Sequence, residues 1–172
     1  MTVNNPINRV EEWRWECLKM SYIAGGTVQD TGFDLPKYGE IDPWSMMVFV
    51  QTADATETLD VGILATESGG DEDGFLDGID VASTGWVRPS FTIVDGTNTR
   101  YITPNTWGVL FFTGYAGADT SSGVDPAVPW VRPYIGDGTA KSLTYTVSSS
   151  DTFVGFLMFR WRQLPDLSSF LL

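Results

Sequence analysis

The residues best suited to chemistry in this chain are acids gathered on one glycine-rich stretch. Residues 67–80 contain no lysine or arginine, and six of them carry carboxylates: Glu67, Asp71, Glu72, Asp73, Asp77 and Asp80. Clustered carboxylates on a tightly turning loop can bind calcium, which takes about six to eight oxygen ligands. The sequence therefore offers Asp71, Asp73 and Asp77 as candidate calcium ligands.

The same acids also fit a solvated surface loop. The run Asp71-Glu72-Asp73-Gly74 departs from the EF-hand pattern, because its glycine comes too early and no glutamate stands at the twelfth position. We therefore expect no cofactor, and calcium stays open as the alternative.

The amino-acid composition offers few of the residue combinations that catalysis commonly uses. The chain has no histidine, which removes Ser-His and Cys-His nucleophilic pairs and histidine-based metal sites. A glycosidase needs only two carboxylates at a fixed separation. Among 22 acids some such pair is expected by chance, so this signal carries no information. We expect no enzymatic activity.

The charge balance narrows the classes of partner. The net charge is −12, from 22 acids and 10 bases. Binding to phosphates requires clustered Lys and Arg, so nucleic acid and anionic membrane surfaces are both unexpected partners. The charge is explained either by solubility or by attraction to a basic partner surface.

The N-terminus and the lengths of the apolar stretches suggest where the protein resides, whereas its one cysteine indicates no redox compartment. The N-terminus lacks the apolar run of a secretory signal, and no stretch approaches the ~18 apolar residues of a membrane span. We expect a soluble protein that is made in the cytoplasm. Cys17 lies in an alternating run, which predicts a buried core thiol.

Alternating apolar residues predict strands along most of the chain. An all-β antiparallel two-sheet sandwich, jelly-roll-like, with N- and C-terminal arms fits their number and their long connections. We expect an N-terminal arm at 1–16, the sandwich at 17–163 and a C-terminal tail at 164–172. The predicted strands are 17–24, 45–52, 58–65, 90–94, 98–103, 107–113, 131–135, 140–148 and 152–162.

Trp-Val-Arg-Pro occurs twice, at 86–89 and at 130–133, followed each time by a strand, an Asp-Gly pair and another strand. This order predicts two related antiparallel units. Asp95-Gly96 and Asp137-Gly138 are typical of hairpins, because both central positions of a type I′ turn need positive φ.

The seven tryptophans and the apolar tail are the other candidate contact residues. Trp107 and Trp161 are expected in the core, whereas Trp44, Trp86 and Trp130 are expected to plug the sandwich ends. Tryptophans that stay exposed would suit sugar binding. The segment 1–16 packs either on its own domain or on a neighbour, and the tail has the same two options. The candidate interface residues are Trp13, Trp15, Leu167, Phe170, Leu171 and Leu172.

The run Leu59-Asp60-Val61-Gly62-Ile63-Leu64, continued by residues 67–78, resembles capsid decoration (cement) proteins of tailed bacteriophages. The resemblance covers about twenty residues and extends to the small, acidic, all-β, histidine-free character of the chain. It implies a virion protein on the capsid exterior that binds the major capsid protein as a homo-oligomer, commonly a trimer. It implies no catalytic residue.

Two alternatives to the decoration protein stay open. One is a carbohydrate-binding β-sandwich module of a phage fibre or adhesin, which exposed aromatic rings would serve. The other is a different virion part, such as the base of a head fibre.

Overall fold

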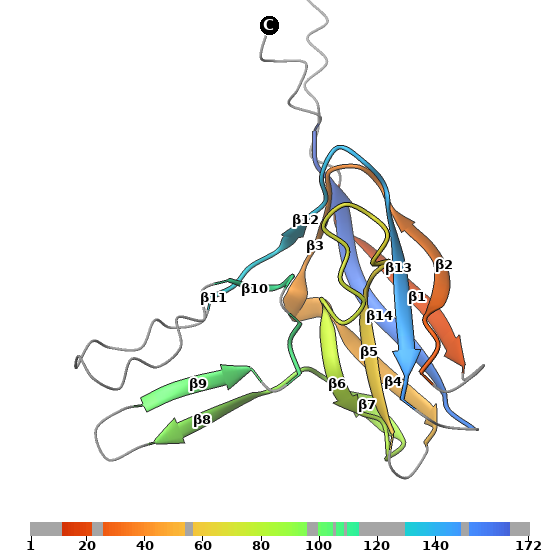
Figure 1. The fold of residues 1–172 in the computed structure, drawn as a ribbon, viewed down its shortest axis with the longest axis vertical. Coiled ribbons are helices and arrows are strands. Elements are labelled where there is room, and N and C mark those ends of the chain that lie inside the picture. Colours follow the sequence, from red (N-terminus) through yellow and green to blue (C-terminus); the bar gives the residue numbers. More distant parts are fainter. Residues whose placement is uncertain are drawn as a thin grey trace, which may run out of the picture.

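The computed structural model describes residues 12–21, 26–53, 57–95, 100–104, 106–108, 110–113, 130–148 and 152–165. Two antiparallel sheets pack face to face (Figure 1). The predicted all-β sandwich is confirmed.

Sheet A is organised around its longest strand, β14 (Val154–Gln163). The strand β1 (Arg14–Ser21) pairs with one edge of β14. Along the other edge lie β4 (Met47–Thr52) and β3 (Gly39–Ile41), end to end, which in turn pair with β7 (Gly85–Val87) and β12 (Tyr134–Ile135).

A single turn of 3-10 helix, η1 (Pro43–Ser45), separates β3 from β4. The side chain of Asp42 caps it by accepting a hydrogen bond from the Trp44 backbone N–H at 3.1 Å. Pro43 suits the first helical position because its missing N–H would have no partner there. The turn interrupts pairing along β14 and leaves Trp44 exposed.

Sheet B has the order β2-β13-β5-β6. Its strands are β2 (Gln29–Leu35), β13 (Lys141–Val147), β5 (Thr58–Ile63) and β6 (Leu76–Asp80).

The connectivity is that of a jelly roll. In chain order the eight principal strands are β1, β2, β4, β5, β6, β7, β13 and β14, and they form the orders β1-β14-β4-β7 and β2-β13-β5-β6. The chain crosses to the other sheet at every step except the β5–β6 pair. This arrangement corresponds to two interlocked Greek keys.

The segment between β7 and β13 adds smaller pairs outside the two sheets. The strands β8 (Phe91–Asp95) and β9 (Arg100–Pro104) form a hairpin that Figure 1 shows apart from the sandwich. The strands β10 (Phe112–Thr113) and β11 (Trp130–Val131) pair with each other.

The predicted internal repeat is wrong, because its two copies occupy unlike positions. Trp86 lies in β7 within sheet A, whereas Trp130 lies in β11 and pairs with β10. The Asp137-Gly138 pair does not close a hairpin, since β12 joins β3 while both edges of β13 are taken by β2 and β5. The first pair does accompany a hairpin, but Asp95 pairs with Arg100, which leaves four residues between the strands.

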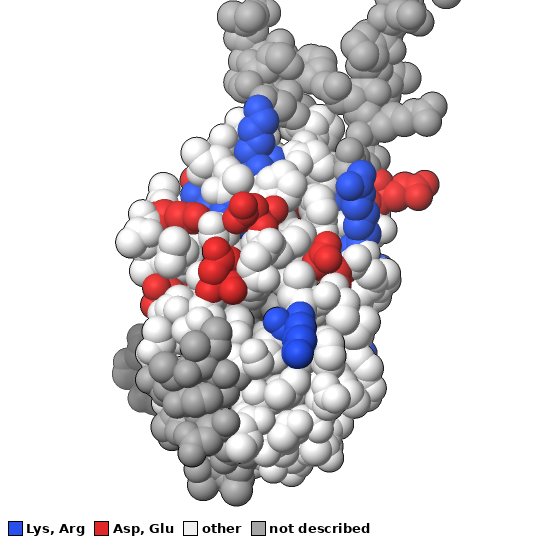
Figure 2. Space-filling view, turned by 90° about the vertical axis from the view of Figure 1, so that its right-hand side faces the viewer, with Lys and Arg blue, Asp and Glu red and all other residues white. Residues whose placement is uncertain are grey.

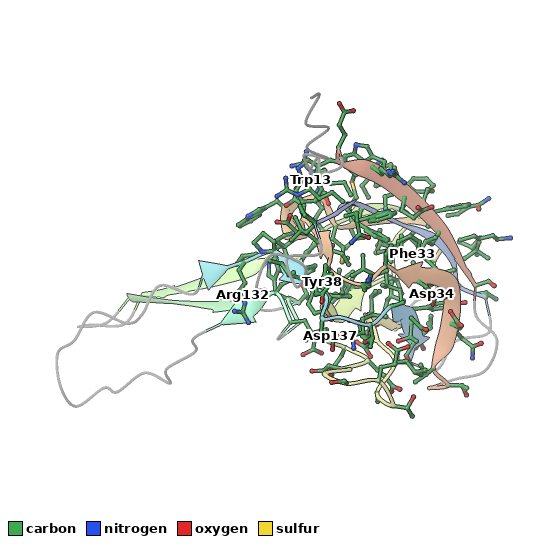
Figure 3. The ribbon with its side chains drawn as sticks, turned by 90° about the horizontal axis from the view of Figure 1, so that it is seen from above. Trp13, Phe33, Asp34, Tyr38, Arg132 and Asp137 are labelled. Atoms are coloured by element: carbon green, nitrogen blue, oxygen red, sulfur yellow. The ribbon has the colours of Figure 1, made fainter. Side chains whose placement is uncertain are left out.

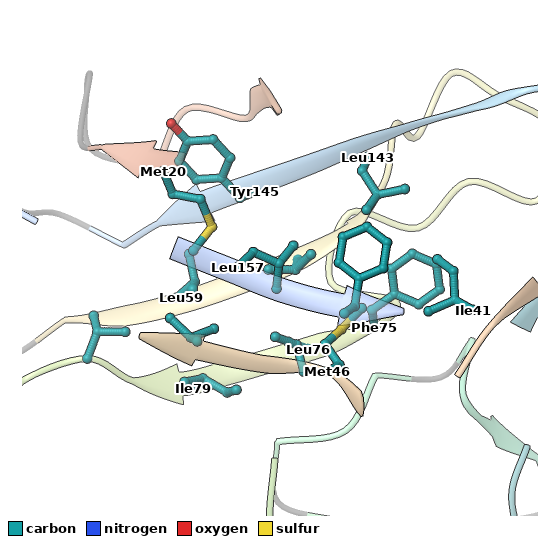
Figure 4. Packing of buried hydrophobic residues seen from close by; sticks show 14 of the residues in the cluster. Met20, Ile41, Met46, Leu59, Phe75, Leu76, Ile79, Leu143, Tyr145 and Leu157 are labelled. Carbon is teal, nitrogen blue, oxygen red and sulfur yellow. The ribbon is translucent and has the colours of Figure 1, made fainter. Parts of the chain in front are cut away.

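The core fills the space between the two sheets. Figure 4 shows Met20, Ile41 and Leu157 of sheet A facing Leu59 and Leu143 of sheet B. All five side chains have no exposed surface. Burying a side chain of this size contributes roughly 1.5–3 kcal/mol, so this layer is the main source of stability.

The predicted domain boundary at residue 16 falls inside a strand. β1 begins at Arg14, which pairs with Trp161 of β14. Residues 1–11 and 166–172, which hold most of the two predicted arms, lie outside the described residues.

Candidate functional site: the outer face of sheet A

The face of sheet A that points away from the core carries aromatic, sulfur-containing and basic side chains in cross-strand rows. Alternation along each strand sends one set of side chains inward and the other outward. The register aligns Lys19, Phe156, Phe49 and Trp86 in one row across β1, β14, β4 and β7. We call this surface the sheet A outer face; it comprises Trp15, Cys17, Lys19, Trp44, Met47, Phe49, Trp86, Arg88, Phe156, Met158 and Arg160.

Three tryptophans project from this face with more than half of their surface exposed. The exposed fractions are 56% for Trp15, 60% for Trp44 and 57% for Trp86. Trp86 packs on Phe49, with ring centroids 5.0 Å apart. Large apolar side chains grouped in this way on a soluble domain typically mark an interaction surface.

A pocket of about 190 Å³ opens between Trp15 and Trp44. The η1 turn forms one side of it, because Trp44 and Ser45 both belong to that turn. The remaining lining residues are Asp42, Met47, Arg88 and Arg160.

An ion pair fixes the wall of the pocket. The Arg160 guanidinium lies 2.6 Å from the carboxylate of Asp42, whose side chain is 11% exposed. The Arg160 backbone N–H also donates to the Ser45 hydroxyl at 2.8 Å. Arg160 is thereby held in place, and its charge is balanced by that of Asp42.

Two other cations on this face have no such balance within the described part of the chain. Arg88 donates to the sulfur of Met47 at 3.4 Å, a weak acceptor. Among the described residues neither Arg88 nor Lys19 forms an ion pair. Both can therefore accept an anionic group from outside.

The predicted interface residues divide into three groups. Trp15 is exposed on the sheet A outer face. Trp13 is half-buried against its own domain, with its ring 4.5 Å from the Arg162 guanidinium and 5.1 Å from that of Arg160. Figure 3 shows Trp13 at the rim of the sandwich. The tail residues Leu167, Phe170, Leu171 and Leu172 lie outside the described residues.

Cys17 is exposed, so the prediction of a buried thiol is wrong. Cys17 pairs with Met158 on the outer side of sheet A, whereas its neighbours Leu18 and Met20 point toward the core. The same correction applies to Trp44 and Trp86, which are exposed and do not plug the sandwich ends. Trp107 and Trp161 are buried, as predicted.

The acidic loop, which is the part of the stretch 67–80 that precedes β6, lies against the opposite side of the sandwich, on the outer side of sheet B. The Asp71 carbonyl accepts the Ile63 N–H at 2.8 Å, which holds the loop against β5. A depression of about 390 Å³ is lined by four acids and by Thr146 of β13, among other residues. The acids are Asp60, Asp71, Glu72 and Asp73.

Hydrogen bonding, burial and neighbouring negative charge together raise the pKa of several of these acids. The hydrogen bond between Asp71 and Asp73, together with partial burial and the negative charge of Asp73, raises the pKa of Asp71 to about 6. Burial raises the pKa of Asp60 and of Asp77, and the charge of Asp73 raises both further.

The predicted calcium ligands are thus neighbours. However, no group of three or more acidic or thiol side chains among the described residues is arranged to hold a metal ion. Calcium binding by Asp71, Asp73 and Asp77 stays a prediction, which thermal unfolding in the presence of calcium would test.

A buried lysine fastens the acidic loop to sheet B. Lys141 donates to the Ser68 carbonyl at 2.7 Å, and the Glu67 carboxylate accepts the Ser142 N–H at 3.0 Å. At this end of the sandwich Figure 3 shows Tyr38 close to Asp137, whose carbonyl accepts the Tyr38 N–H at 2.9 Å. These contacts are structural, because every polar group in them satisfies another.

The edge formed by β1 and β2 is neither mainly acidic, like the outer side of sheet B, nor aromatic and basic, like the sheet A outer face. Figure 2 views the molecule from that side and shows acidic and basic side chains interspersed. The two outer sides of the sandwich therefore differ in charge: acids line the outer side of sheet B, and cations lie on the sheet A outer face.

Within the part of the chain that the structure describes, no helix has the length and apolar character needed to cross a membrane.

No protein-family model matches the chain, and a comparison with curated proteins found no match. Among solved structures, the chain is similar to one from "Acidic stable capsid structure of Helicobacter pylori bacteriophage KHP30". The TM-score is 0.42 at 14% sequence identity, over 90% of this chain and 94% of that one.

Proposed function

We propose that this chain is a virion structural protein: a capsid decoration, or cement, protein that binds the major capsid protein on the exterior of the head and stabilises the shell. It works as a homo-oligomer, with three copies as the expected number, and it catalyses no reaction. It is made in the host cytoplasm, requires no cofactor, and binds neither nucleic acid nor membranes.

The observation that carries this proposal is the sheet A outer face. A jelly roll that leaves Trp15, Trp44 and Trp86 exposed on one face has a surface built for contact, and aromatic residues dominate the binding energy of protein interfaces. The core beneath that face is closely packed, so the face is rigid and loses little conformational entropy on binding. The local resemblance to decoration proteins agrees with this reading.

Binding to heads is the direct test. Purified chain is mixed with empty heads assembled from the major capsid protein encoded by the same genome, and the heads are sedimented. Saturable co-sedimentation and a higher temperature of head disruption are expected. A chain that stays in the supernatant at micromolar concentration with fully matured heads would refute the proposal.

Oligomeric state is a separate measurement. Light scattering on the free protein should give a mass about three times that of the 18.9 kDa chain. A monodisperse monomer would remove the homo-oligomer from the proposal but would leave head binding to be judged by sedimentation.

The exposed tryptophans also favour a second candidate, a carbohydrate-binding module of a phage fibre or adhesin, because ring faces stack on sugar faces. The pocket between Trp15 and Trp44 measures about 190 Å³, below the roughly 300–1,000 Å³ of typical small-molecule sites. Tryptophan fluorescence across a glycan panel separates the candidates. A decoration protein gives no saturable response, whereas a lectin-like module does.

A further inference from the structure

We propose that the sheet A outer face is the surface that docks on the capsid protein, with an apolar partner side chain seated between Trp15 and Trp44 and a partner carboxylate bound by Arg88. This inference rests on the proposed function and adds to it the docking face and the chemistry of the partner. The partner surface is apolar at its centre and carries carboxylates around it.

The apolar part of the inference follows from exposure and size. Trp15 and Trp44 are more than half exposed and flank the pocket, so covering them removes apolar surface that the isolated chain leaves in water. At about 190 Å³ the pocket has room for one large side chain and is small for a separate ligand. Interface hot spots typically have this form, an anchor seated in a pocket near the centre of the contact.

The charged part follows from which cations are already balanced. Arg160 is neutralised by Asp42 and Arg162 by Glu40, so these two arginines shape the surface without attracting a further anion. Arg88 lines the pocket, and Lys19 lies in the row of Phe156. Neither forms an ion pair among the described residues, so both favour a partner that supplies carboxylates.

The acidic side of the sandwich sets the orientation. Asp60, Asp71, Glu72 and Asp73 lie on the outer side of sheet B, away from the sheet A outer face. An acidic partner repels that side and attracts the other, so the docked chain turns its acidic loop outward. This orientation replaces the expectation that the acidic charge itself meets a basic partner.

The test compares three variants in the head-binding assay. Trp15→Ala removes one wall of the pocket, and we expect a rise in Kd of about 30-fold, as for an interface hot spot. Arg88→Glu should slow association by about tenfold and reduce its dependence on salt, while Arg88→Lys restores most of the rate. Asp34→Asn, which changes an exposed carboxylate of β2 in sheet B, serves as the control and should bind like the wild type. Unfolding curves confirm that each variant is folded.

Cys17 provides a measurement that needs no variant. It lies on the sheet A outer face between Trp15 and Lys19, so a docked partner should shield it from a maleimide. Alkylation at least tenfold slower on heads than in free protein is the expected result. Equal rates would overturn the inference.

The outcomes separate the inference from the function. If the wild type binds heads and Trp15→Ala binds equally well, or if only Asp34→Asn is impaired, another face docks; the inference fails and the function stands. If Trp15→Ala dissociates the free oligomer but binds heads normally, the face joins copies of this chain, which also overturns the inference. If the wild type does not bind heads at all, the proposed function fails first.

Discussion

The Lys141 ammonium lies 2.9 Å from the carboxylate of Asp137, although the Lys141 side chain is 1% exposed and that of Asp137 is 47% exposed. The pair therefore has one partner in the protein interior and one in water. Lys141 also donates to the carbonyl of Ser68, at the start of the acidic loop. The loop is thus held to sheet B by a cation whose counterion is reached by solvent.

This difference in exposure predicts that removing the exposed Asp137 lowers the free energy of unfolding more than removing the buried Lys141 does. Lys141→Met leaves Asp137 hydrated and should lower the free energy of unfolding by about 1 kcal/mol, the value of a typical hydrogen bond. Asp137→Ala leaves a buried ammonium with the Ser68 carbonyl as its remaining acceptor, so it should destabilise the protein more. Urea unfolding at one protein concentration measures both variants.

The double variant Lys141→Met/Asp137→Ala provides the control. It should be less stable than Lys141→Met only by the hydrogen bonds that Asp137 accepts from Thr139, because the cation that needed Asp137 is gone. If Lys141→Met lowers the free energy of unfolding more than Asp137→Ala does, the buried ammonium does not depend on Asp137.

The acidic loop predicts a dependence of stability on pH. The pKa of Asp71 is raised to about 6 in the folded state, chiefly by its hydrogen bond with Asp73. Protonation is therefore favoured in the folded chain. The resulting stability is fully present below the unfolded pKa, near 3.9, and is lost as the pH rises through about 6. The thermal unfolding midpoint should be higher at pH 5 than at pH 7.5.

Substitution separates this effect from the general relief of negative charge. Asp71→Asn should raise the midpoint at pH 7.5 and shrink the difference between the two pH values. Asp34→Asn changes an exposed carboxylate in β2 and should leave that difference as it was. A difference that survives in Asp71→Asn would assign the pH effect to other groups.

The sequence predicts the strands in which apolar residues alternate with polar ones, and it misses the strands that carry few apolar residues. β5 and β13 match their predicted ranges within two residues. The sequence predicts a connection where β2 lies, because β2 carries Asp30, Gly32 and Asp34 and contributes few side chains to the core. The sequence predicts a loop where β6 lies, because Gly78 stands in the middle of that strand, where it adopts a φ of 66°. A strand beside a well-formed neighbour needs only a few apolar anchors, and such a strand leaves little trace in sequence.

The sequence predicts only part of the candidate site, for a related reason. It indicates Trp15 as an interface residue, but it predicts Trp44 and Trp86 at the sandwich ends. Both faces of β14 carry apolar residues, so alternation alone does not tell which face is covered. Pairing decides it, because the neighbours of Phe156 are Lys19 and Phe49, on a side where the described residues form no second layer. That information lies in contacts between residues far apart in the chain.

The acidic loop lies so close to Gly62 that no larger side chain fits at this position. A Cβ at this position would lie 2.0 Å from the Asp71 carbonyl oxygen and 2.5 Å from the carbonyl carbon of Glu72. Both are backbone atoms, so the loop itself would have to move. Gly62→Ala should cost about 1–3 kcal/mol or more in urea unfolding.

Gly136 is the matched control for this change. A Cβ there would meet its nearest atom, the Gly39 carbonyl oxygen, at 3.6 Å, an ordinary contact. Gly136→Ala should therefore stay within about 0.5 kcal/mol of the wild type. Equal effects at the two positions would show that the loop does not lie on β5 as closely as described.

The reactivity of Cys17 measures whether the sheet A outer face is accessible to solvent in the free protein. Its thiol is exposed, and its β1 neighbours on the same face are Trp15 and Lys19. Native protein should therefore react with Ellman's reagent to one thiol per chain, at a rate within about tenfold of that in urea, because thiol reactivity follows exposure and thiolate content. Reaction that requires unfolding would mean that the face is covered in the free protein, by another copy or by another part of the chain. Cys17→Ser supplies the blank, and it should unfold at the wild-type midpoint because the side chain contributes nothing to the core.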